Sequence, residues 1–289
     1  MKEPEKRVLS IDFDYFQNAP LHTVKQIFPD GIDLTTELSE ITWGIRYAFF
    51  EKQMNQVSIR KEELSMLKDI LSIQKDSIPV IIANSHAGIY DFVHEQVPFS
   101  ERLLMYNIDM HHDMYNNNPV PDCGNWGGFL EKEYSYGLRW FCNPISKPMY
   151  GLVRNQYTES KVDEMIPESL STLQEGKHKK FDAIYLCRSD NWSAPHLDIY
   201  FTELCDLIQQ RFCNLQMEQG IDIPRKQYLA IAEEIKTEYQ EQYKNKKPNL
   251  NELRQIESDY AKDCNIIFSN VVILNSPKKV KAERGIGYE

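Results

Sequence analysis

The sequence predicts an α/β protein built in three layers, with a mainly parallel β-sheet between two layers of helices. Apolar segments rich in β-branched residues alternate along the chain with segments of helical periodicity, which is typical of β-α-β units. Asp and His residues follow three of the apolar segments, and ligands collect at the carboxyl ends of strands in such sheets. We expect residues 1–289 to form one domain, with a mostly helical region over about residues 197–262.

The expected strands are short and apolar, as buried parallel strands are. They lie at residues 7–16, 80–83, 103–106, 138–142, 181–187 and 266–274, of which the last is the expected final strand. Helices are expected over residues 60–75, 129–136 and 159–178, and another begins near Ser193 with Pro195 in its first turn. The polar residues 276–289 are expected to form a loose tail.

Composition excludes several classes of partner. The net charge of −10 leaves no basic excess to neutralise phosphates, so no nucleic-acid partner is expected. The apolar runs fall short of the ~20 residues that a membrane span needs, and the amino-terminal residues lack an apolar signal segment. The six cysteines contain no Cys-x-x-Cys pair, so neither a zinc knuckle nor a disulfide framework is expected. We expect a cytoplasmic protein with reduced thiols, and nothing indicates its oligomeric state.

Six polar residues near strand ends form a candidate metal site: Asp12, Asp14, His86, Asp109, His111 and Asp113. Most are spaced two apart, so their side chains are expected on one face of a strand. Carboxylate and imidazole donors favour Mn²⁺, Zn²⁺ or Fe²⁺ over a soft ion. Four carboxylates exceed what one tetrahedral zinc ion uses, so two ions are expected. Without a metal, the aspartates would close Asx turns or form salt bridges, and His86 would be structural.

The segment 115–128 is rich in Asn, Pro and Gly, which predicts a long ordered loop at the carboxyl end of a strand. Such loops commonly contact substrates, and Asn125 and Trp126 are the candidates here. A later strand end carries Arg188 and Asp190. Asp190 would either meet a cationic group of a substrate or pair with Arg188, and the sequence leaves both open.

Several of these segments resemble motifs of the arginase and ureohydrolase superfamily, which shares its fold with the histone deacetylases. Residues 109–113, Asp-Met-His-His-Asp, resemble its Asp-x-His-x-Asp motif, and residues 10–14, Ser-Ile-Asp-Phe-Asp, resemble its Ser-x-Asp-x-Asp strand. Residues 84–87, Asn-Ser-His-Ala, lie where a Gly-Gly-Asp-His motif supplies a histidine, and residues 123–127, Cys-Gly-Asn-Trp-Gly, are similar to its Ser-Gly-Asn loop. The resemblance covers about residues 7–130. It implies a permuted strand order, because the Ser-x-Asp-x-Asp strand comes first here.

Together with residues 188–196, these motifs are most similar to the peptide arginases, which convert arginine to ornithine within a peptide and release urea. The resemblance implies a small guanidino compound or an arginine-containing peptide as substrate, and two Mn²⁺ ions. Carried over by position, the ligands of one ion are Asp12, His86, Asp109 and Asp113, and those of the other are Asp12, Asp14, Asp109 and His111. A hydroxide between the ions would attack the guanidinium carbon.

Two departures from the family concern catalysis. The family has a proton-shuttling His two residues after the Asn of its loop, and this chain has Gly127 there. Another group must then move the proton, for which His112, His94 and His196 are candidates. The family's guanidinium-binding Glu lies on a late strand, where Asp190 is the candidate. His112 and Asp190 are therefore the expected catalytic residues.

Three other functions stay open. The motif Asp12-Phe13-Asp14 after an amino-terminal strand is typical of haloacid-dehalogenase-type phosphatases, although that class has Thr or Val where this chain has Phe16. A zinc-dependent deacylase would share the fold and use one Zn²⁺ with fewer ligands. A non-catalytic binding module would retain the metal for structure alone.

Overall fold

The computed structural model describes residues 5–29, 33–115, 118–150, 168–175 and 180–263. Within these residues the protein has a six-stranded, all-parallel sheet in the order β6-β5-β1-β7-β4-β8. The strands are β1 (Glu5–Asp12), β4 (Val80–Ala83), β5 (Arg102–Asp109), β6 (Tyr136–Cys142), β7 (Ala183–Cys187) and β8 (Leu215–Met217). A separate antiparallel pair consists of β2 (Gln17–Asn18) and β3 (Ser58–Ile59).

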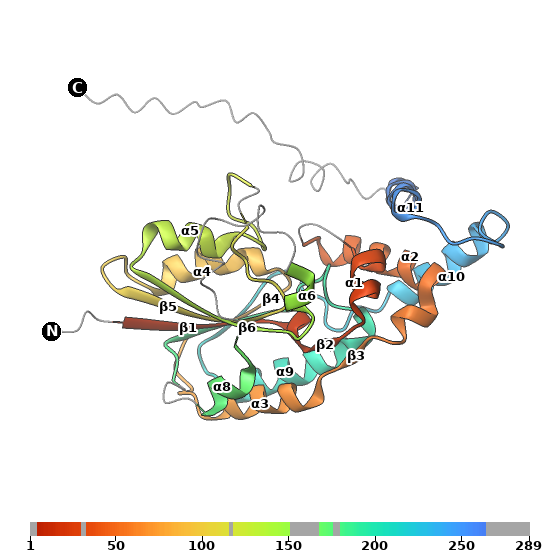
Figure 1. The fold of residues 1–289 in the computed structure, drawn as a ribbon. Helices are drawn as coiled ribbons and strands as arrows, with labels where there is room; N and C mark the ends of the chain where they lie inside the picture. Colours follow the sequence, from red (N-terminus) through yellow and green to blue (C-terminus); the bar gives the residue numbers. More distant parts are fainter. Residues whose placement is uncertain (1–4, 30–32, 116–117, 151–167, 176–179, 264–289) are drawn as a thin grey trace, which may run out of the picture.

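Helices cover both faces of the sheet, which confirms the predicted three-layer α-β-α architecture (Figure 1). One face carries α4 (Ile89–Gln96) and α5 (Trp126–Glu133), and the other carries α3 (Lys61–Ser72), α8 (Leu170–Glu175) and α9 (Asp198–Arg211). Beyond the carboxyl ends of the strands lie α1 (Leu21–Ile27), α2 (Thr36–Met54), α10 (Tyr228–Glu238) and α11 (Leu250–Asp263). Both α10 and α11 contact α2, and the short α6 (Ser146–Tyr150) follows β6.

Side-chain alternation along the strands supplies two separate hydrophobic cores. Val8 on β1 and Met105 on β5 belong to the core beneath α4 and α5. Their neighbours Leu9 and Tyr106 belong to the core beneath α3 and α9. Because side chains on a strand point alternately to the two faces, a continuous apolar run satisfies both cores at once. This explains why these strands lack a polar face.

Five of the six sheet strands coincide with predicted ones, and β8 is the exception. The sequence predicted a mostly helical region there, and it did not reveal β8, which is a three-residue, largely exposed edge strand and is too short to show a two-residue alternation. Helix α5 begins at Trp126 and not at residue 129, since the two glycines after Trp126 are typical of a loop. The predicted strand 266–274, the tail 276–289 and most of the predicted helix 159–178 lie outside the described residues.

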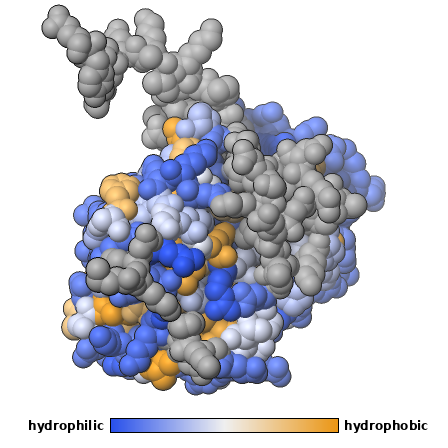
Figure 2. Space-filling view, turned by 60° about the vertical axis from the view of Figure 1, so that its left-hand side comes forward, coloured by the Kyte–Doolittle hydropathy of each residue, from blue (hydrophilic) through white to orange (hydrophobic). Residues whose placement is uncertain are grey.

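The described surface is largely polar. Figure 2 shows one side of the molecule, on which hydrophilic residues cover most of the coloured surface and hydrophobic ones form small, separated groups. Large exposed hydrophobic residues come from separate elements: Ile73, Phe99, Val120, Ile199, Met217, Leu229 and Leu250. Among the described helices, none combines the length and apolar character that crossing a membrane requires.

A buried network of charges holds the loop after β7. Arg188 Nε lies 2.5 Å from Asp190 Oδ1, and Arg188 Nη2 lies 3.0 Å from Asp190 Oδ2. Arg188 also pairs with Asp198, at 3.2 Å, and Arg225 Nη2 reaches the other oxygen of Asp198 at 2.6 Å. Thr36 of α2 donates a hydrogen bond of 2.9 Å to Asp190. These four charged side chains are almost completely buried, so the loss of any one of them would leave an unpaired buried charge and destabilise the fold.

Arg225→Met should lower the free energy of unfolding by about 3–5 kcal/mol, because it leaves the buried Asp198 with incomplete compensation. Urea denaturation measures this loss. Lys68→Met is the control, since Lys68 pairs with Glu203 on the surface, and it should cost less than about 1 kcal/mol. Equal losses in the two variants would contradict the importance of the buried network.

Candidate metal centre

Asp12 and Asp109 end two adjacent parallel strands, β1 and β5. The register pairs Ile11 with Ile108, so the two aspartates come level at the carboxyl edge of the sheet. Two-residue alternation from Val8 places Asp12 on the face that α4 and α5 cover, and the same holds for Asp109. Adjacent strands are separated by only about 4.8 Å, so the two carboxylates are forced together.

His86 joins this pair from a short 3-10 turn directly after β4. Its Nδ1 lies 3.3 Å from Asp12 Oδ2 and 3.2 Å from Asp109 Oδ2. Asp113, just past β5, places its Oδ2 3.1 Å from the same nitrogen. On the other side of the ring, His86 Nε2 lies 2.6 Å from Ser10 Oγ, and this contact fixes the ring orientation.

His111 and Asp14 form a second half of the cluster. His111 Nδ1 lies 2.9 Å from Asp14 Oδ2 and 3.5 Å from Asp109 Oδ1. Asp109 therefore faces both imidazoles, with one carboxylate oxygen toward each. Two groups of possible ligands result, which share Asp109 and have ligand atoms within 4.8 Å of one another. The structure thus brings together all six residues that the sequence analysis selected as ligands.

Backbone N–H groups orient three of the carboxylates. Asp12 Oδ1 accepts a hydrogen bond from Asp14 N at 3.0 Å. Asp14 Oδ1 accepts one from Met110 N at 3.1 Å, and Asp109 Oδ1 accepts one from His111 N at 2.6 Å. Each bond fixes its carboxylate, and the second oxygen of each aspartate turns toward a histidine.

Asp113 is held by side chains. Its backbone has φ of 55°, in the left-handed region that Asp tolerates better than most residues. Trp126 Nε1 donates a hydrogen bond of 2.8 Å to Asp113 Oδ2, and the Trp126 ring packs 5.2 Å from that of His86. Asn107 Nδ2 lies 3.2 Å from Asp113 Oδ2 and 3.3 Å from Asp109 Oδ2, so one amide ties two carboxylates together.

Negative charge dominates the cluster. Burial, with Asp12 and Asp109 nearby, holds the pKa of Asp14 well above its usual value. Burial and Asp109 likewise raise the pKa of Asp113 to about 6. Burial alone would lower the pKa of His86, but the surrounding carboxylates, Asp113 first, outweigh it and raise this pKa. The pKa of His111 is raised in the same way, by Asp14 first. The two imidazoles are thus the groups of the chain that oppose the negative charge, since no described Lys or Arg forms an ion pair with the six residues.

Two buried atoms point to a cation in this centre. Asp14 Oδ2 and His86 Nδ1 have no hydrogen bond of acceptable geometry, although ligand atoms of other residues lie within 3.3 Å of each. Buried polar atoms normally have partners, so converging donor atoms without hydrogen bonds fit a metal ion between them. Carboxylate oxygens and imidazole nitrogens suit Mn²⁺, Zn²⁺ or Fe²⁺.

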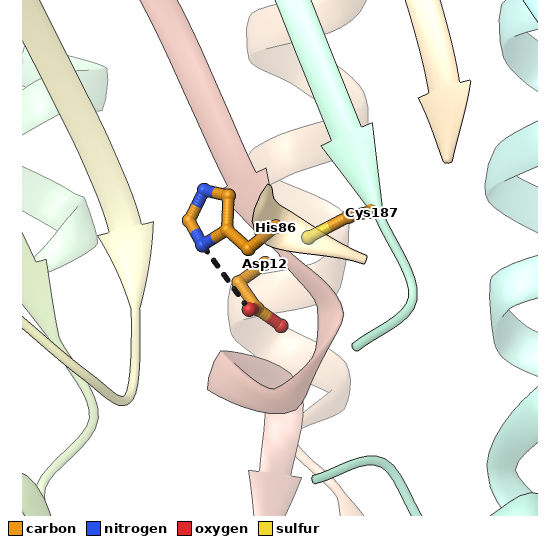
Figure 3. A group of neighbouring side chains, drawn as sticks. All are labelled: Asp12, His86 and Cys187. Carbon is orange, nitrogen blue, oxygen red and sulfur yellow. Dashed lines mark ion pairs between the residues drawn. The ribbon is translucent and has the colours of Figure 1, made fainter. Parts of the chain in front are cut away.

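Cys187 brings a thiol to the His86 half of the cluster. It ends β7, is paired with Asp12 in the sheet register and is fully buried. Figure 3 shows the sulfur on the same side of the sheet as His86 and Asp12, and ligand atoms of these three residues lie within 4.8 Å of one another. Burial, followed by Asp12, raises the pKa of the thiol. The sequence analysis missed Cys187 because it considered cysteines only as pairs.

Asp33 also escaped the sequence analysis. It lies between α1 and α2, where its Oδ2 accepts a hydrogen bond from His86 N at 3.2 Å and its Oδ1 accepts one from Asn191 N at 3.4 Å. Burial raises its pKa to about 7, with further contributions from Asp12 and Asp190. Asp33 does not directly follow a strand, and no motif surrounds it, so only the fold reveals this fifth carboxylate.

Asn125 and Trp126 were predicted to bind substrate, and the structure corrects this. Asn125 is buried and closes its own loop, since its Oδ1 accepts a hydrogen bond from Asp122 N at 2.7 Å and its Nδ2 donates one to Val120 O at 3.0 Å. Trp126 is fully buried and holds a ligand carboxylate. Both side chains are therefore buried and have hydrogen-bond partners within the chain.

The structure gives His112 and Asp190 contacts within the chain. The ring of His112 contacts those of Tyr115 and Trp140, its Nδ1 accepts a hydrogen bond from Met114 N at 2.8 Å, and burial lowers its pKa to about 3. Asp190 is paired with a guanidinium of the chain itself, which is the second of the two alternatives that the sequence left open.

The other two candidate proton shuttles make contacts away from the six ligands. His94 on α4 lies 2.9 Å from Glu133 on α5. His196 contacts Tyr47 through Nδ1 and the backbone oxygen of Val57 through Nε2. Their described partners belong to the helical layers and the β3 region, so neither contacts the centre.

Gly127 lies against the ligand loop. Its N–H donates a hydrogen bond of 3.0 Å to the backbone oxygen of Asp113. A Cβ at this position would lie 2.7 Å from Met114 Sδ and 3.0 Å from that same oxygen of Asp113. A side chain at this position would therefore require Met114 and the backbone of Asp113 to shift.

Comparisons with known proteins do not place the chain in a family. No protein-family model, no curated protein and no solved structure matches it.

Trp126→Phe should keep the ring that packs on His86 but remove the hydrogen bond to Asp113. Residues that orient metal ligands typically contribute 10–100-fold to affinity, so a loss of about that size is expected in a calorimetric Mn²⁺ titration. Tyr134→Phe is the matched control, because Tyr134 bonds only Val97 O in the same core. Unchanged affinity in Trp126→Phe would show that Asp113 needs no such support.

Proposed function

We propose that the protein is a dinuclear metal hydrolase that acts on a C–N bond. The observation that carries this proposal is the position of Asp109, whose two oxygens face His86 and His111 in separate ligand groups. With neutral histidines, the four carboxylates of the centre carry the charge that two divalent cations balance. One ion would be held by Asp12, His86, Asp109 and Asp113, and the other by Asp12, Asp14, Asp109 and His111.

Mn²⁺ is the ion that we propose, with Zn²⁺ or Fe²⁺ as alternatives, because oxygen donors outnumber nitrogen donors. Two such ions lower the pKa of a bound water and stabilise negative charge that develops on a reacting group. The protein holds the ligands rigidly, through Ser10, Asn107 and Trp126, and buries them away from bulk water. Fixed, desolvated charge of this kind is the main protein contribution to such catalysis.

The particular reaction that we propose is the conversion of arginine to ornithine with release of urea, on a small guanidino compound or on an arginine side chain within a peptide. Support comes from the resemblance of residues 10–14 and 109–113 to the metal motifs of arginases, and from the meeting of these two segments in one centre. The net charge of −10 suits a cationic substrate and not a nucleic acid. We place the activity in the cytoplasm, where Cys187 would stay reduced.

With Mn²⁺, the purified protein should release urea from an arginine-containing peptide, and mass spectrometry should detect the mass loss from arginine to ornithine. Asp109→Asn should abolish this reaction and reduce the bound metal, because it removes the carboxylate that both halves share. Asp206→Asn is the control, since Asp206 is exposed on α9. A wild-type protein that binds two ions but converts no guanidino compound would refute the proposed reaction.

A zinc-dependent deacylase is the second candidate, and Cys187 favours it. A thiol within reach of Asp12 and His86 would suit Zn²⁺ better than Mn²⁺. Metal content separates the two functions. Close to two Mn²⁺ per chain supports the guanidine hydrolase, and close to one Zn²⁺ per chain supports the deacylase.

A further inference from the structure

We propose that Cys187 is a metal ligand, and that its sulfur gives the His86 half of the centre a stronger preference for Zn²⁺ over Mn²⁺ than the His111 half has. This inference rests on the metal centre of the proposed function, and it holds whichever bond the centre hydrolyses. Three observations carry it: the place of Cys187 in the sheet, the distances among the donor atoms, and a buried nitrogen of His86 without a hydrogen bond.

Cys187 lies in the same row of strand ends as two of the ligands. The strands β5, β1 and β7 are adjacent, and they end with Asp109, Asp12 and Cys187. Asp12 is the register partner of Cys187, and Asp109 comes level with Asp12 on its other side. Residues paired across parallel strands point to the same face, so the thiol projects with the two carboxylates toward α4 and α5. The third strand of this row therefore contributes a donor atom, as the first two do.

The donor atoms lie at distances that one ion can span. Ligand atoms of Asp12, His86 and Cys187 are all within 4.8 Å of one another. A zinc ion binds sulfur at about 2.3 Å and oxygen at about 2.0–2.2 Å, so a sulfur and an oxygen on opposite sides of it are separated by about 4.5 Å at most. Only small movements are needed for the three donors to share one ion. Figure 3 shows that they come from three separate segments, which are β1, β7 and the turn after β4.

His86 gives an independent indication of an ion at this place. Its side chain is 1% exposed, and its Nδ1 has no hydrogen bond of acceptable geometry. The other ring nitrogen, Nε2, lies 2.6 Å from Ser10 Oγ, so Nδ1 is the nitrogen that remains for a metal. It lies 3.3 Å from Asp12 Oδ2, the register neighbour of Cys187. A buried nitrogen without a partner is costly in a protein interior, and a bound ion would supply that partner.

The alternative is that Cys187 only fills the core. A buried free cysteine commonly packs as a small hydrophobic residue, and Cys187 does belong to the core beneath α4 and α5. Cys142 is the useful comparison, because it ends β6 and is the register partner of Asp109. Among the described residues, Cys142 belongs to none of the possible ligand groups, whereas Cys187 joins one. A cysteine beside a ligand aspartate is therefore not enough, and the neighbouring histidine distinguishes Cys187.

Sulfur changes the metal preference of one half only. Thiolate is a soft ligand that suits Zn²⁺, whereas carboxylates suit Mn²⁺. The His111 half, which consists of Asp14, Asp109 and His111, contains no sulfur. When the ion binds, the Cys187 thiol loses its proton to solvent and the metal–sulfur bond forms. Mn²⁺ alone would occupy both halves, but the first Zn²⁺ offered would enter the half that contains Cys187.

The test uses the full-length, reduced, metal-free protein and Co²⁺, which replaces Zn²⁺ as a spectroscopic probe. Cobalt bound to a thiolate shows strong sulfur-to-metal charge-transfer absorption in the near ultraviolet, which cobalt bound only to oxygen and nitrogen lacks. The variant is Cys187→Ser, and the matched control is Cys142→Ser at the end of the neighbouring strand β6. Calorimetric titrations measure the affinities for Zn²⁺ and Mn²⁺.

In the wild type, the charge-transfer absorption should appear with the first equivalent of Co²⁺ and then stop rising, since only one half contains sulfur. Cys187→Ser should lose this absorption and bind Zn²⁺ at least about tenfold more weakly, with a smaller change for Mn²⁺. Cys142→Ser should behave as the wild type does. X-ray absorption at the zinc edge needs no variant, and it should find a sulfur neighbour about 2.3 Å from Zn²⁺ in the wild type.

Absence of sulfur coordination from the wild type, its persistence in Cys187→Ser, or equal losses of Zn²⁺ and Mn²⁺ affinity would overturn the inference. Urea release is measured separately, with the Mn²⁺-loaded wild type. Sulfur coordination by Cys187 without any urea release would leave this inference standing and refute the proposed reaction. Urea release without sulfur coordination would do the reverse.

Discussion

The crowding of four carboxylates at one edge of the sheet is the constraint on which the rest of the structure depends. Asp12 and Asp109 end adjacent strands and project to the same face, while Asp14 and Asp113 follow within a few residues. Like charges buried this close destabilise the fold unless something positive lies among them. The chain supplies two imidazoles and keeps its arginines elsewhere, so a metal ion bound among these carboxylates would offset their repulsion.

Strand alternation accounts for how precisely the cluster is assembled. The face that carries Val8 and Met105 into the core beneath α4 and α5 also carries Ser10 and Asn107, the two residues that support the ligands. Along that face the side chains of Val8 and Met105 are apolar, and those that follow become polar only in the last residues before the carboxyl edge of the sheet. The hydrophobic core and the polar centre therefore depend on the same strand register. A shift of either strand by one residue would turn its side chains to the other face and disrupt both.

Much of the fold and the ligand set could be predicted because both depend on short-range periodicity. The alternation that predicts buried strands also predicts which polar residues share a face, and it selected six residues that the structure brings together. It could not predict Asp33, which reaches the centre from the connection between α1 and α2. It also could not decide between a substrate and Arg188 as the partner of Asp190, because pairing within a loop leaves no periodic trace. The substrate-binding roles predicted for Asn125 and Trp126 have the same difficulty, because the same residue types occur in loops that close on themselves and in loops that contact a substrate.

The tight approach of Gly127 to the ligand loop makes the backbone of Asp113 sensitive to the residue at position 127. Its N–H holds the backbone oxygen of Asp113, and any side chain there would press on the residue that supplies a ligand. A histidine introduced at 127 would thus gain an imidazole and distort an aspartate in the same step. The position of the Asp113 carboxylate thus depends on a neighbour that has no side chain at all.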